Sequence, residues 1–392
     1  MHQCGSLPAA QARPRPSPKA PRRGCTGAAS LLPAARAGGL RSGRRALPAA
    51  RATPSAGDAR VVCLGEALYD YLADQKGLPR DQVASWTPYP GGAPANVATA
   101  LARLGVPAAF VSALGRDEMG ERMVELLKER GVDVSGVQRS DAPTRDVYVV
   151  RALNGDREFA GFGLDSGAYC DTRVDAAALP LDRIQGAELL VTGTLGLAAP
   201  ATRAAMDAAV AAARAGGAKV FVDINWRPVF WPQPEAARPV ICAYLEAADL
   251  VKISDADLAY LYGMDHRAAL KDPASVAAKL PRAAGVLVTA GDEGAAYCFR
   301  SSKGEHTGFV PVFKVDVADT TGAGDAFTAG FVYKMLQAGG LERLASDPAA
   351  LHAAVVFAAA TGALTCTRPG AIGSQPTLPE VEALAAKAGA KA

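Results

Sequence analysis

The segment from Asp319 to Phe327, DTTGAGDAF, places three small residues directly before an acid and an apolar stretch with the character of a helix. Gly322, Ala323 and Gly324 leave the backbone uncovered, so consecutive N–H groups at a helix N-terminus can face a phosphate, where the helix dipole also favours negative charge. Asp325 follows at a position where a carboxylate can accept the proton of an alcohol. The segment therefore predicts an anion hole with a general base beside it.

A second glycine pair enters an expected helix far upstream, in the segment GGAPANVA from Gly91 to Ala98. Gly91 and Gly92 let the backbone approach a ligand, and the amide of Asn96 offers a donor and an acceptor to hydroxyl groups. Together the two segments predict transfer of a phosphoryl group to a sugar. Simpler interpretations stay open, because Gly-Ala-Gly also serves tight turns, and a lone Asn here is also typical of a helix cap.

The elements that must position these segments are short apolar runs alternating with alanine-rich stretches, in the manner of repeated βαβ units. This alternation predicts an α/β fold with a mostly parallel sheet covered by helices on both faces. Residues 145–162 break the rhythm and predict a hairpin around Asn154-Gly155. The expected strands are residues 61–68, 108–115, 188–196, 219–225, 250–254 and 285–291, and two of the expected helices are 200–215 and 342–364.

The chain of 392 residues is 49% hydrophobic, which is enough for a large core, and it carries a formal net charge of +3. Residues 1–57 hold ten of the 42 basic residues and no acid, so the remaining 32 basic residues face 39 acidic ones, a net charge of −7. A mildly acidic folded part argues against nucleic acid as a partner.

The N-terminal residues 1–57 are rich in Arg, Ala, Pro and Ser and contain no apolar run of signal-peptide or membrane-span length. We therefore expect a transit peptide and no membrane partner. Prolines at positions 14, 16, 18, 21, 33 and 48 interrupt any amphipathic helix there, which favours a plastid over the alternatives of a mitochondrion or the cytoplasm. Beyond this segment five cysteines are scattered without a CxxC pair, as is typical of buried thiols in a reducing compartment.

The order of GG…N near one end and DTTGAGD near the other resembles the ribokinase or PfkB family of carbohydrate kinases, and within it the fructokinases, from about Val61 to Pro376. The resemblance implies a ribokinase-like three-layer αβα fold in a domain of residues 58–385, before a C-terminal tail of 386–392. It also implies a small β-lid over the sugar, built from parts of about 66–92 and 143–168. No GxxxxGK[ST] pattern occurs, which excludes a P-loop mechanism.

On the sugar side, the resemblance gives Asp70 the family's role of binding sugar hydroxyls, together with Gly91, Gly92 and Asn96. Asp117, in the loop GRDEMG, is a weaker sugar or lid candidate and equally a helix N-cap.

On the phosphate side, the segment VDINWR matches the family's D-x-N-x-R pattern and gives nucleotide-side roles to Asp223 and Asn225. Arg227 would neutralise the transferring phosphoryl group or hold an acidic substrate, and a structural Asp–Arg pair is the alternative. The next motif departs from the family's N-x-x-E, since Ser254 replaces the Asn and Asp257 replaces the Glu. Asp257 is still expected to reach Mg²⁺ through water, because this ion needs few protein carboxylates when phosphates supply oxygens.

The resemblance also implies an ATP site lined by Thr289, Gly291 and Gly294, with Ala359 where relatives commonly carry Asn. Asp319 and Thr321 match positions that hold a monovalent cation in many relatives, so activation by K⁺ is a hypothesis.

The reaction expected from these parts is phosphorylation of a primary sugar hydroxyl by ATP, with fructose 6-phosphate as the product. The family's usual basic residue in the lid is not recognisable in EFAGFGLDSGAY, so ribose, 2-keto-3-deoxygluconate and other polyols stay open as substrates. A nucleoside kinase and a non-catalytic fructokinase-like subunit of an organelle complex are the rival hypotheses. The expected partners are only the sugar and ATP, in a monomer or a lid-mediated homodimer.

Overall fold

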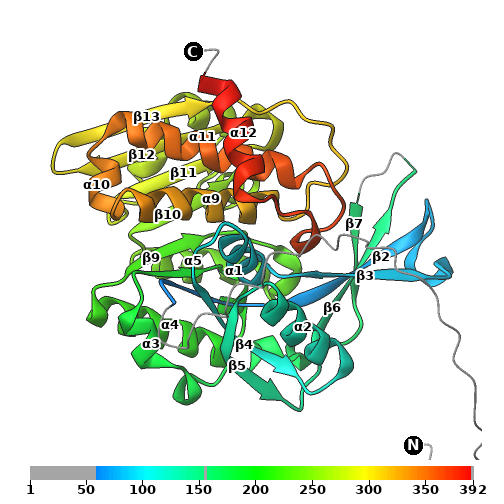
Figure 1. Ribbon diagram of the computed structural model, residues 1–392. Coiled ribbons are helices and arrows are strands. Elements are labelled where there is room, and N and C mark those ends of the chain that lie inside the picture. The colour runs from blue at the N-terminus through cyan, green and yellow to red at the C-terminus, as the bar shows by residue number, and fades with distance from the viewer. Residues whose placement is uncertain (1–58, 154–156, 390–392) are drawn as a thin grey trace, which may run out of the picture. The chain divides into compact units, whose positions relative to one another are not determined.

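In the computed structural model, which describes residues 59–153 and 157–389, nine strands form the main sheet in the order β13-β12-β11-β10-β9-β8-β1-β4-β5 (Figure 1). All neighbouring strands from β11 to β5 run parallel, and β12 and β13 add an antiparallel edge. The predicted α/β fold is therefore confirmed. The strands are β1 (Val61–Leu64), β4 (Ala108–Gly115), β5 (Asp133–Ser140), β8 (Leu189–Thr192), β9 (Lys219–Asp223), β10 (Leu250–Ser254), β11 (Gly285–Thr289), β12 (Ala295–Ser301) and β13 (Gly304–Val310).

Helices cover both faces of this sheet, because its strands present apolar side chains to both sides. In β1, Val62 and Leu64 join one buried cluster, whereas Val61 and Cys63 join the other. Burial of alternate residues on opposite faces is what a central parallel strand requires. The first cluster packs against α3 (Leu181–Gly186), α4 (Pro200–Gly216), α5 (Ala237–Leu245), α6 (Asp255–Tyr262), α7 (His266–Lys271) and α8 (Pro273–Ala277), and the second against α1 (Ala93–Arg103), α2 (Glu118–Glu129), α9 (Ala323–Gln337), α10 (Leu341–Ala345), α11 (Pro348–Thr365) and α12 (Leu378–Gly389).

The predicted helix 200–215 corresponds to α4, but the prediction of one helix over 342–364 is wrong. Two helices, α10 and α11, occupy that range. The break arises because Pro348 has no N–H and starts α11, while the Asp347 side chain accepts from the N–H groups of Ala349 and Ala350. At the other end of the domain α12 continues to Gly389, so the predicted tail does not begin at residue 386.

Four further strands form the lid, a separate sheet that projects from one side of the main sheet (Figure 1). Their order is β3-β2-β6-β7, and β6 and β7 pair antiparallel as the predicted hairpin requires, although its Asn154-Gly155 turn lies outside the described residues. Asp70, two residues beyond the expected strand 61–68, lies within strand β2. The bounds are β2 (Leu68–Lys76), β3 (Trp86–Gly91), β6 (Arg145–Arg151) and β7 (Arg157–Phe162).

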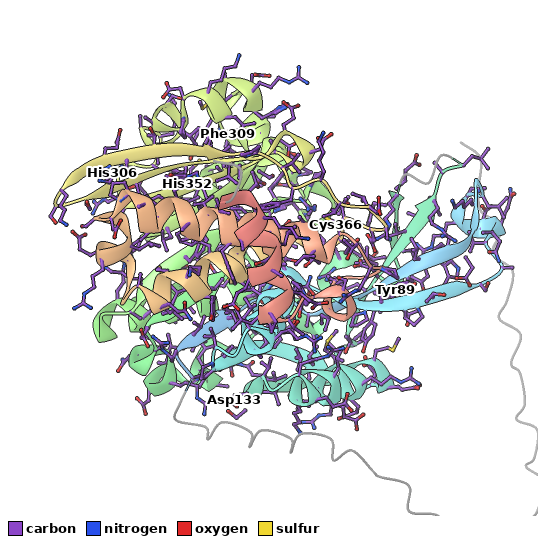
Figure 2. The ribbon with its side chains drawn as sticks, turned by 45° about the horizontal axis from the view of Figure 1, so that its top comes forward. Tyr89, Asp133, His306, Phe309, His352 and Cys366 are labelled. Carbon is purple, nitrogen blue, oxygen red and sulfur yellow. The ribbon has the colours of Figure 1, made fainter. Side chains whose placement is uncertain are left out.

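Helix α11 alone among the described helices has the length and apolar composition that would permit crossing a membrane. It packs along α9 and against α12, and half of its apolar stretch is buried inside the domain. A core helix of a large sheet protein passes the same test, and we describe α11 as one. Its His352 contacts Tyr297 of β12, with 3.3 Å between the Tyr297 hydroxyl and His352 Nδ1. In the view of Figure 2, Cys366, which follows its last turn, lies toward the lid.

Candidate active site

A cavity of about 800 Å³ lies beneath the lid, where the loops after several parallel strands meet the start of α9. Ligands bind in α/β sheets at the carboxyl ends of the strands, and this volume is typical of a small-molecule site. The cavity brings together nearly all of the predicted site residues: Asp70, Gly92, Asn96, Asp223, Asn225, Arg227, Asp257, Thr289, Gly291, Gly294, Thr321, Gly322, Ala323, Gly324 and Asp325. Gly91 and Asp319 are not part of this lining, although their neighbours Pro90, Gly92 and Thr320 are.

The predicted anion hole is the first turn of α9, with Gly322 as its N-cap. Gly322 has φ +77°, and a Cβ there would lie 2.6 Å from the Cβ of Ala371, so both backbone shape and space require glycine. The N–H groups of Gly324 and Asp325 belong to a first helical turn, which has no carbonyl partners within the helix. These groups can therefore bind a phosphoryl oxygen, with the helix dipole favouring its charge.

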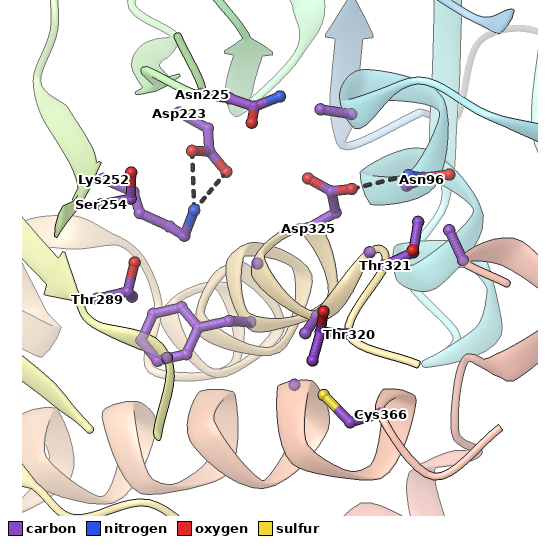
Figure 3. A pocket seen from close by; sticks show the side chains of 18 of the residues that line it. Asn96, Asp223, Asn225, Lys252, Ser254, Thr289, Thr320, Thr321, Asp325 and Cys366 are labelled. Atoms are coloured by element: carbon purple, nitrogen blue, oxygen red, sulfur yellow. Dashed lines mark hydrogen bonds and ion pairs between the residues drawn. The ribbon is translucent and has the colours of Figure 1, made fainter. Parts of the chain in front are cut away.

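Asp325 is held beside this turn by the amide of Asn96, whose Nδ2 donates to Asp325 Oδ2 at 2.7 Å (Figure 3). Burial raises the pKa of Asp325 to about 6, and the neighbouring charge of Asp223 adds to the rise, while the Asn96 hydrogen bond and Lys252 oppose it. A carboxylate with this pKa is ionised at neutral pH and still a stronger base than an exposed aspartate. It suits proton abstraction from a hydroxyl group.

The sugar end of the cavity is built from β2 and the start of α1. Asp70 faces the cavity, and burial raises its pKa to about 6 against the opposing charge of Arg157. A Cβ on Gly91 would lie 3.0 Å from Asp70 Oδ2, so glycine leaves this carboxylate room. Asn96 is 4% exposed, and its Oδ1 has no partner among the described residues, which leaves an acceptor for a ligand hydroxyl.

Asp223 forms a buried ion pair with a lysine that the sequence reasoning missed. Lys252 Nζ lies 2.8 and 2.9 Å from the two carboxylate oxygens of Asp223 (Figure 3). Thr328 Oγ1 donates to Asp223 Oδ2 at 3.0 Å. The predicted alternative of an Asp–Arg pair is wrong, because Arg227 is exposed and donates to the carbonyl of Trp226. A Cβ on Gly324 would lie 3.2 Å from Lys252 Nζ, so the ammonium group borders the anion hole.

Asp257 is committed mainly to local structure. Its Oδ2 accepts from Ser254 N at 2.8 Å and Ser254 Oγ at 2.7 Å in a capping box that starts α6, and its Oδ1 accepts from Trp226 N at 2.9 Å. That last bond holds the turn in which Asn225 adopts φ +43°, the one positive φ of a non-glycine residue in the described ranges. The expected magnesium role of Asp257 stays a prediction. No group of three or more His, Cys, Asp or Glu with metal-binding geometry occurs in the described part of the chain.

The expected nucleotide residues line the opposite end of the same cavity. Gly291 and Gly294 have φ +49° and +101°, and a Cβ on Gly294 would lie 2.6 Å from the carbonyl oxygen of Val310. Thr289, Ala359 and Cys366 complete this end. Ala359 brings no polar group to the cavity, as the sequence departure indicated.

Asp319 and Thr321 lie just before the anion hole and bond to each other and to the lid. Thr321 donates to Asp319 Oδ1 from both N, at 2.9 Å, and Oγ1, at 2.7 Å. Arg157 of β7 approaches Asp319 Oδ2 to 2.8 Å. Asp117, in contrast, caps α2 by accepting from Gly120 N at 2.7 Å and does not line the cavity, so its N-cap interpretation holds and its sugar role does not.

Two more functional candidates escaped the sequence reasoning. Glu66, in the loop after β1, is 4% exposed and lines the cavity, with Oε1 accepting from Ala93 N at 3.0 Å and no described partner at Oε2. Arg157 reaches the cavity from the lid. A charged residue inside an otherwise apolar strand, LVKIS, was a visible signal for Lys252, but neither Glu66 nor Arg157 had one.

A ribokinase-like αβα fold, a lidded cavity and a buried carboxylate at a glycine-capped helix N-terminus are together typical of carbohydrate kinases. The model of the pfkB family carbohydrate kinases matches residues 58–378. Fructokinase-1 of Zea mays is 37% identical over 341 residues, which cover 85% of this chain and all of that protein. The chain therefore belongs to the pfkB carbohydrate kinase family, and it is an ATP-dependent sugar kinase.

Solved structures agree. A fructokinase from Xylella fastidiosa with bound ATP has a TM-score of 0.73 and 33% identity, covering 84% of this chain and 98% of that one. A fructokinase from Vibrio cholerae in a form with fructose, ADP and calcium ion bound has a TM-score of 0.69 and 27% identity, and the match covers 84% of this chain and 99% of that one.

Proposed function

We propose that this kinase phosphorylates the primary hydroxyl of fructose and forms fructose 6-phosphate. The support from relatives is the similarity to fructokinases over nearly their whole length. The position of Asp325 supports the proposed phosphoryl transfer. Asp325 is hydrogen-bonded to Asn96 on the sugar side and lies in the first turn of α9 on the phosphate side.

The transfer follows from this geometry. Asp325 accepts the proton of the hydroxyl as the sugar oxygen attacks the terminal phosphorus, and the N–H groups of Gly324 and Asp325 stabilise the charge on the phosphoryl oxygens in transit. Lys252 and Arg227 add positive charge on the same side of the cavity. Positioning and electrostatics supply most of the rate in such a reaction. The lid excludes water, which would otherwise compete with the sugar for ATP.

The residues present fit magnesium and ATP. Asp257 uses three of about four carboxylate lone-pair positions for the protein, which leaves one for a water on Mg²⁺. When bound, the ion would neutralise charge on the phosphates. Thr289, Gly291 and Gly294 would hold the phosphates and ribose of ATP, and the apolar stretch around Phe313 would border the base.

A monovalent cation fits less well. The side chains of Asp319 and Thr321, which were expected to hold K⁺, are engaged with each other and with Arg157. We therefore assign no step to such an ion.

The sugar is the least constrained part of the proposal. Residues 160–166, which follow Phe159 of the lid, contain no basic side chain. The contact to the sugar that the resemblance to fructokinases implies for a basic residue of this segment is therefore missing. Arg145 is buried and paired with Asp171 at 2.6 Å. It does not line the cavity itself, although its guanidinium lies 4.9 Å from the ring of Phe230, which does. Ribose and 2-keto-3-deoxygluconate are the alternatives.

The experiment is release of ADP by protein starting at Asp58, with ATP and Mg²⁺, on fructose, ribose, 2-keto-3-deoxygluconate, glucose, myo-inositol and adenosine. We expect the highest kcat/KM with fructose, and fructose 6-phosphate as the product. Preference for another sugar would move the assignment to it, and turnover on adenosine alone would contradict a sugar acceptor. Arg116→Gln, on the exposed Arg116–Asp141 pair, is a control that should leave every rate unchanged.

Quaternary state and location are further parts of the proposal. The outer face of the lid carries partly exposed aromatic residues, Tyr71, Trp86 and Tyr148, in mutual contact, which supports lid pairing in a homodimer over a monomer. Sedimentation at two concentrations tests this. Plastid import is supported by the composition of residues 1–57 alone, and uptake by isolated chloroplasts, with mitochondria as the comparison, tests it.

A further inference from the structure

One charged side chain of the lid, Arg157, reaches out of its own sheet to the loop before α9. Its Nη2 lies 2.8 Å from Asp319 Oδ2, and its Nη1 donates to Thr321 Oγ1 at 2.5 Å. The Asp319 side chain is 2% exposed, whereas the Arg157 side chain is 37% exposed and borders the cavity. The lid and the anion hole are thus joined through a buried carboxylate.

This contact completes the hydrogen bonding of Asp319. Oδ1 accepts two bonds from Thr321, and Oδ2 accepts from Gly370 N at 2.7 Å in addition to Arg157. An ionised carboxylate offers about four lone-pair positions, and here each faces a donor. A monovalent cation bound to this carboxylate would need one of these positions. The arrangement does not fit such an ion while Arg157 is in place.

We propose that Arg157 takes the place of a monovalent cation at Asp319 and so makes the geometry of the anion hole depend on lid closure. This inference rests on the proposed kinase function. A guanidinium group is always charged, and its planar fork can hold a carboxylate and a hydroxyl at once. Because the charge belongs to the lid, the loop leading to Gly322 receives it only when the lid covers the cavity. Arg157 is therefore a positioning residue.

The test compares Arg157→Gln with Arg151→Gln. Arg151 is the register partner of Arg157 in the β6–β7 pair, but it donates to the carbonyl of Asp74 inside the lid and does not reach the loop. Two readouts are taken in K⁺ and in tetramethylammonium: turnover with fructose, and the melting temperature of the nucleotide-free protein. The melting temperature needs no substrate, so it tests the role of Arg157 even if fructose is not the sugar that the kinase uses.

We expect the wild type and Arg151→Gln to differ less than about twofold in turnover between the two cations, with equal melting temperatures. Arg157→Gln should lose roughly 10- to 100-fold in turnover in tetramethylammonium, the usual effect of losing a hydrogen bond to a charged group. K⁺ should increase the turnover of Arg157→Gln at least about fivefold over its value in tetramethylammonium. It should also raise the melting temperature of this variant alone. Strong K⁺ activation of the wild type, or a lost turnover in Arg157→Gln that K⁺ changes in neither readout, would overturn the proposal.

Discussion

Replacing Lys252 with Met should destabilise the domain, because it leaves the charge of Asp223 buried without its partner. It should also lower turnover strongly, because it removes the positive charge beside Gly324. Asp223 is 3% exposed, and Lys252 Nζ contacts both of its oxygens. After the change Thr328 is the one side chain among the described residues that still donates to this carboxylate. Breaking a buried ion pair from one side typically costs about 3–5 kcal/mol in the free energy of unfolding.

The expected shift in melting temperature follows from the size of the domain. With about 2.1 cal/mol/K of unfolding entropy per residue over roughly 330 residues, that cost lowers the midpoint by about 4–7 °C. Lys219→Met is the matched control. It breaks an ion pair to Asp249 at 3.4 Å whose lysine is half exposed, and such pairs contribute about 0–1 kcal/mol.

A double variant, Lys252→Met with Asp223→Asn, separates the two effects. Removing both charges should recover at least half of the lost stability, while turnover stays low because the positive charge beside Gly324 is still missing. Calorimetry measures the stability, and release of ADP measures the turnover. If Lys252→Met melts within about 1 °C of the wild type, or the double variant melts no higher than the single one, the buried-pair reasoning is refuted.

Three further predictions concern single residues. A carboxylate must be ionised to accept a proton, and the pKa of Asp325 is about 6. The value of kcat/KM should therefore rise about tenfold per pH unit below pH 6 and level off above it. A flat profile from pH 5 to 8 would count against Asp325 as the base. Gly322→Ala forces a side chain onto φ +77° and against Ala371, and should lower kcat by at least about tenfold while circular dichroism stays native. Burial raises the pKa of Glu66 to about 8, so the folded state keeps a proton that the unfolded state loses above about pH 4.5, and wild-type stability should fall as pH rises between these values. Glu66→Gln, whose amide oxygen can still accept from Ala93 N, should remove that fall, and denaturant midpoints at pH 5.5 and 8 that move equally in both proteins would contradict it.

Much of the fold was predictable because parallel strands buried on both faces are continuous apolar runs. The run at residues 108–115 became β4 at its predicted bounds, and the run at 250–254 became β10. The lid strand β2 was harder, since Leu68–Lys76 follows the first strand after a short loop and contains Asp70, Asp74, Gln75 and Lys76 among its apolar and aromatic residues. The single expected strand over residues 61–68 therefore covered the point where the chain leaves the main sheet and enters the second one.

The site was predictable where backbone chemistry demands special residues, as at Gly322 and Gly92. It was not predictable where the role depends on a partner distant in sequence. Lys252 and Asp223 meet because β9 and β10 are parallel neighbours, and Arg157 meets Asp319 only because the lid folds over the cavity. Asp257 had the expected position, but the Ser254-x-x-Asp257 spacing is also that of a capping box, and the resemblance had assigned Asp257 to a metal alone.

The most direct test of the central claim is single-turnover phosphoryl transfer by Asp325→Asn at saturating fructose and ATP. Asn keeps the size of the side chain and its contact with Asn96 but cannot take up the proton. We predict that the rate of transfer falls by roughly 10²- to 10⁴-fold, the usual effect of removing a general base, while the dissociation constant for ATP changes less than about threefold. A transfer rate within a few-fold of the wild type would show that Asp325 is not the base, and the proposed mechanism would be wrong.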